Sequence, residues 1–324
     1  MKKLTFSAAA FTVLACAAAS SFAQTKWDMP TGYAVASFQT ENVQTFANEV
    51  DKATNGALKI TLHPGGSLYK ANEIKRAVQT GQAQMGEFIL SGAANELPLL
   101  GVDSVPFLAT GYADARKLAD ISRPYLDRAL AAQGMRLLFV SPWPGQSLYS
   151  LKPVASTADL KGTKMRTYNP ATSKIAELVG AQPVTIQLAE LPQALATGGV
   201  DNFLTSSASG VESKLYEQVK NLYTVNAWLP KNAIVVSQKA FDALDKPAQA
   251  AVLKAASDAE ARGWATSERK DGEFLKELVA RGVKVSPPSD ALKRELLAVG
   301  ARMTTDWLKQ AGPDGQAIVD AFRK

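Results

Sequence analysis

The sequence predicts an α/β fold of two domains, with two segments that cross between the domains and one long helix that spans both. Strand patterns alternate with helical patterns from one end of the chain to the other, which is typical of α/β proteins. Removal of a 23-residue N-terminal signal would leave 301 of the 324 residues, the usual size of two domains. The helical pattern at 246–281 corresponds to on the order of 50 Å, more than the width of one domain.

The N-terminus has the pattern of a secretory signal peptide. Two lysines precede an apolar run at 4–19, and a small-x-small cleavage site ends at Ala23. The run is too short for a stable membrane span, so we expect cleavage near Ala23 and a periplasmic location. Cys16, the only cysteine, lies inside the signal. Its surroundings faintly resemble a lipoprotein site, which leaves lipidation open as the minor alternative.

The first domain is predicted to begin with alternating strands and helices. Its strands are expected at 27–29, 58–62, 84–90 and 135–140, and its helices at 40–53, 71–80 and 113–133. Pro124 is expected to interrupt the last of these helices, because proline removes a backbone donor. Two prolines and a glycine then break the rhythm at 141–152, and we interpret this segment as a crossing between domains.

The second domain is predicted from the next part of the chain. Its strands are expected at 184–186 and 201–204, its helices at 175–179, 190–196 and 210–218, and a strand at 233–237 returns to the first domain. A second crossing is expected at 226–231, and two short helices after Pro287-Pro288 finish the chain. The predicted division is therefore 24–146 plus 229–270 for domain I, and 147–228 plus 271–324 for domain II.

Composition argues against several classes of function. The formal charge is +6, or +4 without the two signal lysines, and no run of basic residues with interleaved aromatics indicates nucleic-acid binding. His63 is the only histidine, and the mature chain would lack cysteine, so we predict no metal site and no cofactor. No GxSxG, Walker or GxGxxG motif is present, so we predict no catalytic residues.

The most informative stretch is DLKGTKMRTYNPATSK at 159–174. It places Arg166 on a short strand that leads into Tyr168, Asn169 and Pro170, which favour a bend. A guanidinium offers two parallel donors that match a carboxylate or a phosphate. Because an isolated arginine more often forms a surface ion pair, the interpretation depends on the rest of the chain.

Several segments together resemble the solute-binding (P) subunit of tripartite ATP-independent periplasmic (TRAP) transporters, the DctP family. They are AVQTGQAQMGEF at 77–88, DSVPFLATGYADARKL at 103–118, the stretch around Arg166 with ELVGAQPVTIQLAELPQALATGGVDNF at 177–203, and the long helix after AFDALDKPAQAAV at 240–252. The resemblance implies a two-domain periplasmic binding protein fold, with hinge strands between the domains and a long domain-spanning helix, that closes over its ligand. It also implies small and large permease subunits as membrane partners, and Arg166 as the residue that pairs with the carboxylate of a small organic anion.

The chain departs from the family pattern in two places. Family members often carry Gly-Gln-Glu-Asn-Pro after Val-Asp, with a ligand-binding asparagine, whereas this chain has VDNFLTSSASG. Thr205 takes the approximate place of that asparagine, and the hydroxyls of Thr205, Ser206 and Ser207 could substitute for it. The crossing SPWPGQSLYS lacks the second arginine of sugar-acid binders.

These departures predict a monocarboxylate with an apolar or aromatic body, such as an aromatic 2-oxo or 2-hydroxy acid. The residues expected to contact the ligand besides Arg166 are Glu87, Phe88, Trp143, Tyr149, Tyr168, Asn169, Thr205, Ser206 and Trp228. Two alternatives stay open at this point. The aromatic residues could instead pack the hinge, and Glu87 could form a salt bridge with a neighbour rather than accept a ligand hydrogen bond.

Four readings of the function remain in competition. A TRAP solute receptor is favoured by the DLKG-x-K-x-R segment and the long helix. A receptor for an ABC or tricarboxylate-type system and a module that feeds a signalling receptor belong to the same broad class. An exported enzyme is disfavoured by the scarcity of histidine and cysteine. A monomer is the default expectation.

Overall fold

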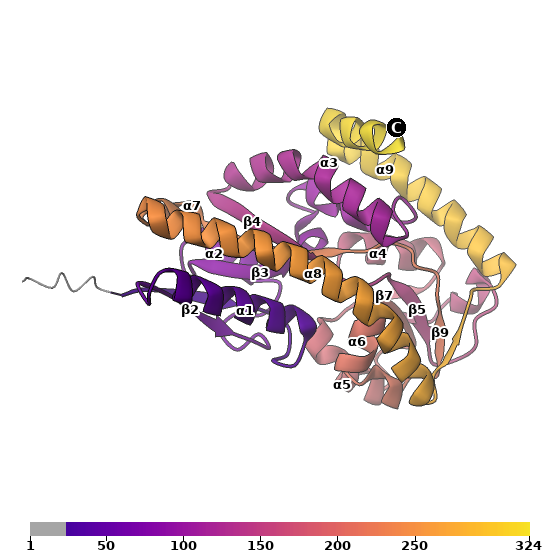
Figure 1. Ribbon diagram of the computed structural model, residues 1–324. Coiled ribbons are helices and arrows are strands. Elements are labelled where there is room, and N and C mark those ends of the chain that lie inside the picture. Colours follow the sequence, from indigo (N-terminus) through magenta and orange to yellow (C-terminus); the bar gives the residue numbers. More distant parts are fainter. Residues whose placement is uncertain (1–23) are drawn as a thin grey trace, which may run out of the picture.

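The structure, a computed structural model, describes residues 24–324. Two α/β domains lie side by side and the long helix α8 runs along both of them (Figure 1). This arrangement confirms the predicted fold class. The predicted signal, with Cys16 and the cleavage site after Ala23, lies outside the described residues. Among residues 24–324, no helix is long and apolar enough to cross a membrane.

Domain I is built on two small sheets joined edge to edge, with the end of β1 beside β3. One sheet has the antiparallel order β3-β10-β4, and the other pairs β1 with β2 in parallel. A bridge between Thr31 and Glu87 connects them. The elements are β1 (Thr25–Pro30), α1 (Phe38–Ala53), β2 (Leu58–His63), α2 (Ile74–Gln79), β3 (Met85–Ile89), α3 (Tyr112–Ala131), β4 (Met135–Pro142), β10 (Lys231–Ser237) and α7 (Gln238–Asp242).

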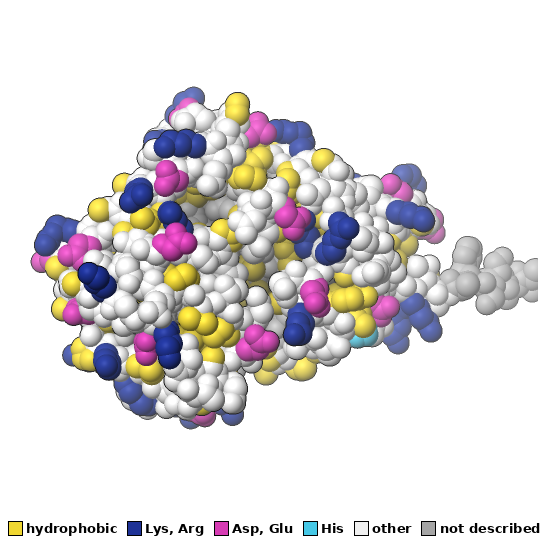
Figure 2. Space-filling view, turned by 180° about the vertical axis from the view of Figure 1, so that it is seen from behind, with side chains coloured by type: hydrophobic (Ala, Val, Ile, Leu, Met, Phe, Trp, Pro, Cys, Tyr) yellow, Lys and Arg dark blue, Asp and Glu magenta, His cyan; other side chains and the backbone are white. Residues whose placement is uncertain are grey.

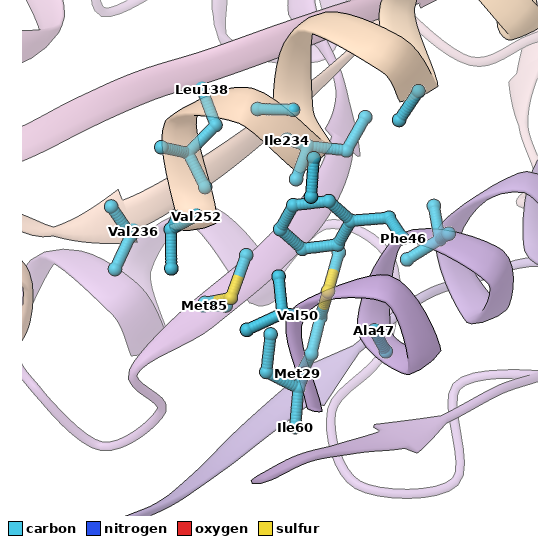
Figure 3. Close-up of a cluster of buried hydrophobic side chains, with 14 of the residues drawn as sticks. Met29, Phe46, Ala47, Val50, Ile60, Met85, Leu138, Ile234, Val236 and Val252 are labelled. Carbon is cyan, nitrogen blue, oxygen red and sulfur yellow. The ribbon is translucent and has the colours of Figure 1, made fainter. Parts of the chain in front are cut away.

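The core of domain I lies between these sheets and the helices α1 and α8. Phe46 and Val50 of α1 meet Met29 and Ile60 of the β1–β2 pair, and Val252 of α8 closes the cluster (Figure 3). Buried positions of α1 recur at the helical period while β1 and β2 alternate inward and outward, so each element shows the periodicity of its own class.

Domain II is a six-stranded sheet of order β11-β9-β5-β8-β6-β7, flanked by short helices. Its elements are β5 (Ser147–Ser150), β6 (Lys164–Thr167), α4 (Pro170–Leu178), β7 (Gln182–Thr185), α5 (Leu191–Ala196), β8 (Asn202–Thr205), α6 (Ser207–Glu212), β9 (Asn221–Tyr223) and β11 (Lys284–Ser286). The helix expected at 210–218 is in fact divided between α6 and a 3₁₀ turn at Leu215–Glu217.

The two crossings between the domains pair with each other. Trp143 N–H donates to Pro230 O at 2.8 Å, and Gln146 N–H donates to Trp228 O at 2.8 Å. Ala227 N–H in turn donates to Gln146 O at 2.9 Å. The two crossings expected from the sequence therefore form a two-stranded connection between the domains.

Helix α8 (Lys246–Ala280) is continuous over 35 residues and joins the two domains. Asp245 caps its N-terminus by accepting from Ala248 N–H at 2.7 Å, and it ends before Gly282, whose φ of +85° favours glycine. Its early turns pack in the domain I core and Leu278 packs in the domain II core. Gly263 allows close contact with β4, because a Cβ there would lie 2.7 Å from Ser141 Oγ.

Two helical expectations need correction. Pro124 does not interrupt α3, which runs unbroken over 20 residues. The carbonyl that loses its partner belongs to Asp120, an exposed residue, so water can replace the missing N–H. The C-terminal pair is longer than expected, because α9 (Asp290–Arg323) breaks only at Gly312, which has φ +63°.

Helix α9 touches both domains. Leu292 and Leu296 pack in the domain II core, whereas Ile318 lies in a cluster with Leu118 of α3. Figure 1 shows the C-terminal end of α9 beside α3. The predicted division of the chain places all of 271–324 in domain II, and its boundaries stay a prediction.

Candidate functional site

A cavity of about 330 Å³ lies between the two domains. Domain I contributes the ends of β1 and β3 and the turn at 65–72, while domain II contributes the ends of β6 and β8 and the turn at 187–190. The first crossing lines it with Trp143 and Gln146. Strand ends and helix starts at a domain boundary are a common place for a small-molecule site.

Arg166 lies at the domain II side of this cavity. On β6 it follows Met165, which packs in the domain II core, so alternation along the strand turns the arginine to the other face. The side chain is only 3% exposed. Its Nε donates to Ile186 O at 2.8 Å, and its guanidinium lies 4.7 Å from the centre of the Tyr168 ring. One edge of the guanidinium is therefore held in a fixed direction.

No carboxylate of the described chain neutralises Arg166. None of the ion pairs among residues 24–324 includes it. Burial lowers the pKa of Arg166 to about 10, which still leaves it charged at neutral pH. A buried cation without an anionic partner is unfavourable, so this geometry suits an anion supplied by a ligand.

Glu87 lies at the domain I side of the cavity. It is fully buried and accepts two hydrogen bonds, from Thr31 Oγ1 to Oε2 at 2.5 Å and from Asn232 Nδ2 to Oε1 at 2.8 Å. Burial raises the pKa of Glu87 to about 7, and the two hydrogen bonds oppose that rise. Within the described chain Glu87 has no cationic partner, so the salt bridge considered as its alternative role does not form.

Three of the aromatic residues at the cavity are ones that the sequence singled out. Phe88, Trp143 and Tyr168 all line the cavity. The Tyr168 hydroxyl donates to Gln146 Oε1 at 3.2 Å, which ties domain II to the crossing. Burial raises the pKa of Tyr168 above its usual value, so the hydroxyl stays a neutral donor. Thr205, at the end of β8, also lines the cavity.

Four of the predicted site residues do not line the cavity. Tyr149 stacks on Phe203 with ring centres 5.1 Å apart in the domain II core, and Trp228 is fully buried in the other core cluster of that domain. Asn169 caps α4, and Ser206 caps α6 with its side chain accepting from Ser209 N–H at 3.1 Å. Tyr149 and Trp228 therefore pack inside domain II instead of lining the cavity.

Asn169 has a second contact that joins the domains. Its Nδ2 donates to Ser91 Oγ of domain I at 2.8 Å, while its Oδ1 accepts from Thr172 N–H at 2.8 Å. On the α1 side, Glu212 of α6 accepts from Phe38 N–H at 2.9 Å. These contacts hold the domains together around the cavity.

Sequence reasoning missed several residues of the site. Tyr33 lines the cavity, and its hydroxyl donates to Asn232 Oδ1 at 2.8 Å. Lys70, Lys75 and Arg76 add positive charge to the lining, beside Glu96, which pairs with Lys75. The only signal in the sequence for Asn232 was its position as a polar residue directly before the predicted strand at 233–237.

The described residues contain no group of three or more histidine, cysteine, aspartate or glutamate side chains that could hold a metal. His63 Nε2 lies 2.8 Å from Asp28 Oδ1, and neither residue lines the cavity. Figure 2 shows basic and acidic side chains interspersed over one face of the molecule, without a continuous basic patch on that face.

Comparison with known proteins assigns the family. Residues 31–310 match the DctP family, described as bacterial extracellular solute-binding protein, family 7. A curated solute-binding protein of Albidiferax ferrireducens is 29% identical over 259 residues, which cover 78% of this chain and 76% of that protein.

Solved structures are similar over nearly the whole chain. DctP6 of Bordetella pertussis, an extracytoplasmic solute receptor that binds pyroglutamic acid, is 50% identical, with a TM-score of 0.91 and coverage of 92% of this chain and 99% of that one. A marine metagenome TRAP solute-binding protein, solved with co-purified pyroglutamate, is 44% identical, also with a TM-score of 0.91, and the match covers 93% and 99% of the two chains. The present chain belongs to the DctP family and is an extracytoplasmic solute receptor of the TRAP type rather than an enzyme.

Proposed function

We propose that this receptor captures a small cyclic monocarboxylate of the pyroglutamate type, with Arg166 as the carboxylate anchor. The observation that carries the proposal is the buried guanidinium of Arg166, which faces an interdomain cavity and has no anionic partner in the described chain. Relatives at 50% and 44% identity bind pyroglutamate, and pyroglutamate carries one carboxylate on a five-membered lactam ring.

The size and walls of the cavity support a small ring. A volume of about 330 Å³ lies near the lower end of the range for ligand pockets, roughly 300–1,000 Å³. Phe88, Trp143 and Tyr168 offer flat apolar surface. The same walls favour a second candidate, an aromatic 2-oxo or 2-hydroxy acid, which we expected from the sequence. Solved relatives with gulonate or glucuronate are only 21–22% identical and inform the fold alone.

The finer assignments complete the proposal. The signal is removed near Ala23, and the mature receptor works in the periplasm as a monomer. It delivers its ligand to the small and large permease subunits of a TRAP transporter. Of the residues predicted from the sequence, Arg166, Glu87, Phe88, Trp143, Tyr168 and Thr205 would contact the ligand. Asn169 would act through closure of the domains.

A thermal-shift panel tests the proposed ligand class. The mature chain, stripped of co-purified ligand by unfolding and refolding, is heated with pyroglutamate, phenylpyruvate, glucuronate or the neutral lactam pyrrolidin-2-one. A ligand at 100 times its dissociation constant adds about 2.7 kcal/mol to the free energy of unfolding. We expect a large shift with pyroglutamate and little with the others. A larger shift with phenylpyruvate would instead select the aromatic acid, and no shift with any acid would contradict the proposal.

A further inference from the structure

We propose that Glu87 acts as an ionised hydrogen-bond acceptor that requires the ligand to present an N–H or O–H donor, and that Asn232 is the positioning residue that orients it. This inference rests on the proposed function and narrows it. The ligand would be a monocarboxylate that carries an N–H or O–H donor besides its carboxylate, such as the ring N–H of pyroglutamate. Dicarboxylates and donor-free acids would then be rejected.

The orientation of the Asn232 amide follows from its neighbours. Trp143 Nε1, which can only donate, lies 2.9 Å from Asn232 Oδ1, and the Tyr33 hydroxyl donates to the same oxygen at 2.8 Å. The oxygen of the amide must therefore face Trp143, which leaves Nδ2 facing Glu87. Asn232 is fully buried, so it presents a donor to Glu87 Oε1 and cannot offer an acceptor there.

The direction of the Thr31 hydroxyl is fixed in the same way. Tyr33 N–H donates to Thr31 Oγ1 at 3.3 Å, so the hydroxyl hydrogen is left for Glu87 Oε2, 2.5 Å away. Both carboxylate oxygens of Glu87 thus receive a hydrogen from the protein. This arrangement favours the carboxylate over the carboxylic acid, because a proton on either oxygen would compete with one of these donors.

A carboxylate that already accepts on both oxygens can still accept further hydrogen bonds, and Glu87 lines the cavity. A ligand N–H can donate to them, whereas a ligand oxygen at that place would meet negative charge. A site with a buried acceptor for a ligand donor strongly rejects an analogue that lacks this donor, because the acceptor is then left unpaired. Arg166 on the domain II side and Glu87 on the domain I side therefore set the direction in which the ligand binds.

The other charged and titratable groups near Glu87 are few. Tyr33 and Tyr168 line the same cavity, and burial raises the pKa of both. Next to Asn232 on β10, Lys231 is paired with Asp103 at 3.3 Å. The charged residues elsewhere in the lining, besides Arg166, are Lys70, Lys75, Arg76, Glu96 and Glu190. Because burial raises the pKa of Glu87 to about 7, its charge state should be visible in the pH dependence of binding.

The experiment is calorimetric titration of the mature chain with three matched ligands. Pyroglutamate has the carboxylate and the N–H, 5-oxotetrahydrofuran-2-carboxylate replaces the N–H by a ring oxygen, and pyrrolidin-2-one lacks the carboxylate. We expect the lactone acid to bind at least about 100-fold more weakly than pyroglutamate at pH 8, and succinate to show no binding. As the pH falls from 8 to 5.5, protonated Glu87 gains a hydrogen to donate, so the preference for pyroglutamate should shrink at least tenfold.

The outcomes separate the two proposals. Equal binding of pyroglutamate and the lactone acid at every pH would overturn the role of Glu87 and leave the carboxylate receptor intact. No binding of either acid would overturn the proposed function itself. A preference of about 100-fold for pyroglutamate that does not change with pH would also contradict the proposal, because the preference is expected to depend on the charge of Glu87.

Variants test the groups that hold Glu87. Thr31→Val keeps the shape of a fully buried side chain but removes the donor to Oε2, so we expect the pH at which the preference is lost to rise by about one unit. Thr31→Ser keeps a hydroxyl donor, so in this variant the preference should be lost at the same pH as in the wild type. Asn232→Leu should weaken pyroglutamate at least tenfold more than the lactone acid, which a general loss of structure would not do. Equal weakening of both ligands would refute the positioning role of Asn232. If a variant fails to fold, the ligand series on the wild-type protein still tests the role of Glu87.

Discussion

Replacement of Arg166 by alanine tests the carboxylate anchor. The side chain is 3% exposed, and burial lowers its pKa from the usual value of arginine to about 10. At about 1.4 kcal/mol for each pKa unit, this corresponds to about 3 kcal/mol of unfavourable desolvation of the charge. A ligand carboxylate offsets that cost. We therefore expect Arg166→Ala to lose about 3 kcal/mol of binding free energy, or about 100-fold in affinity, within the range of about 2–5 kcal/mol for a buried charge pair.

Arg166→Lys separates charge from geometry. The guanidinium is aimed by its bond to Ile186 O at 2.8 Å and by its contact with the Tyr168 ring. Lysine keeps the charge but cannot offer two parallel donors, so we expect a loss of at least tenfold in affinity that is still smaller than the loss in the alanine variant.

The assay is isothermal titration calorimetry with pyroglutamate at pH 8, on protein freed of co-purified ligand. Arg281→Ala is the matched control, because that guanidinium lies 5.1 Å from the Tyr216 ring centre, on the surface of the same domain. The control should bind as the wild type does. An Arg166→Ala variant that keeps its fold and binds within threefold of the wild type would refute the reasoning.

Three further predictions follow from packing and charge. Gly86→Ala should lower the free energy of unfolding by about 1–3 kcal/mol in a urea titration, because a Cβ there would lie 2.6 Å from Ile74 Cγ2; an unchanged midpoint would contradict this. Burial raises the pKa of Glu87 and of Glu212 to about 7 in the folded state, above the value near 4.5 of an unfolded chain, so the unfolded state releases these protons first. The ligand-free receptor should therefore lose stability as the pH rises from about 4.5 to 7, by up to about 3 kcal/mol for the fully buried Glu87, and a urea series in which stability is flat or rises over this range would contradict it. Glu212→Ala removes the acceptor of Phe38 N–H across the domain boundary, so small-angle scattering should show a larger radius of gyration without ligand, whereas Glu212→Gln, which keeps an acceptor, should resemble the wild type.

Local signals in the sequence account for the parts that were predicted. Arg166 was found because a strand, a bend and a helix start follow one another within a few residues. The long helix was found because Pro247 in its first turn and Gly282 at its stop are read from neighbouring residues. Such features depend on contacts within a few positions, and a single sequence contains them.

The parts that were missed depend on contacts between distant segments. Tyr33 meets Asn232 across 199 positions of the chain, and Glu87 meets the same amide across 145. No local pattern reveals these pairings. Tyr149 and Trp228 were expected in the cleft because the crossings are rich in aromatics, yet the packing of the domain II sheet buries them. Residue type alone could not distinguish the wall of a cavity from the core behind it.

A crystal structure of the mature receptor with pyroglutamate tests the central claim most directly. We predict the carboxylate at hydrogen-bond distance, about 2.7–3.2 Å, from the terminal nitrogens of Arg166, with the ring N–H directed at Glu87. A ligand whose carboxylate is bound by Lys70 or Arg76 at the cavity lining, with the terminal nitrogens of Arg166 left without an anion, would contradict the account.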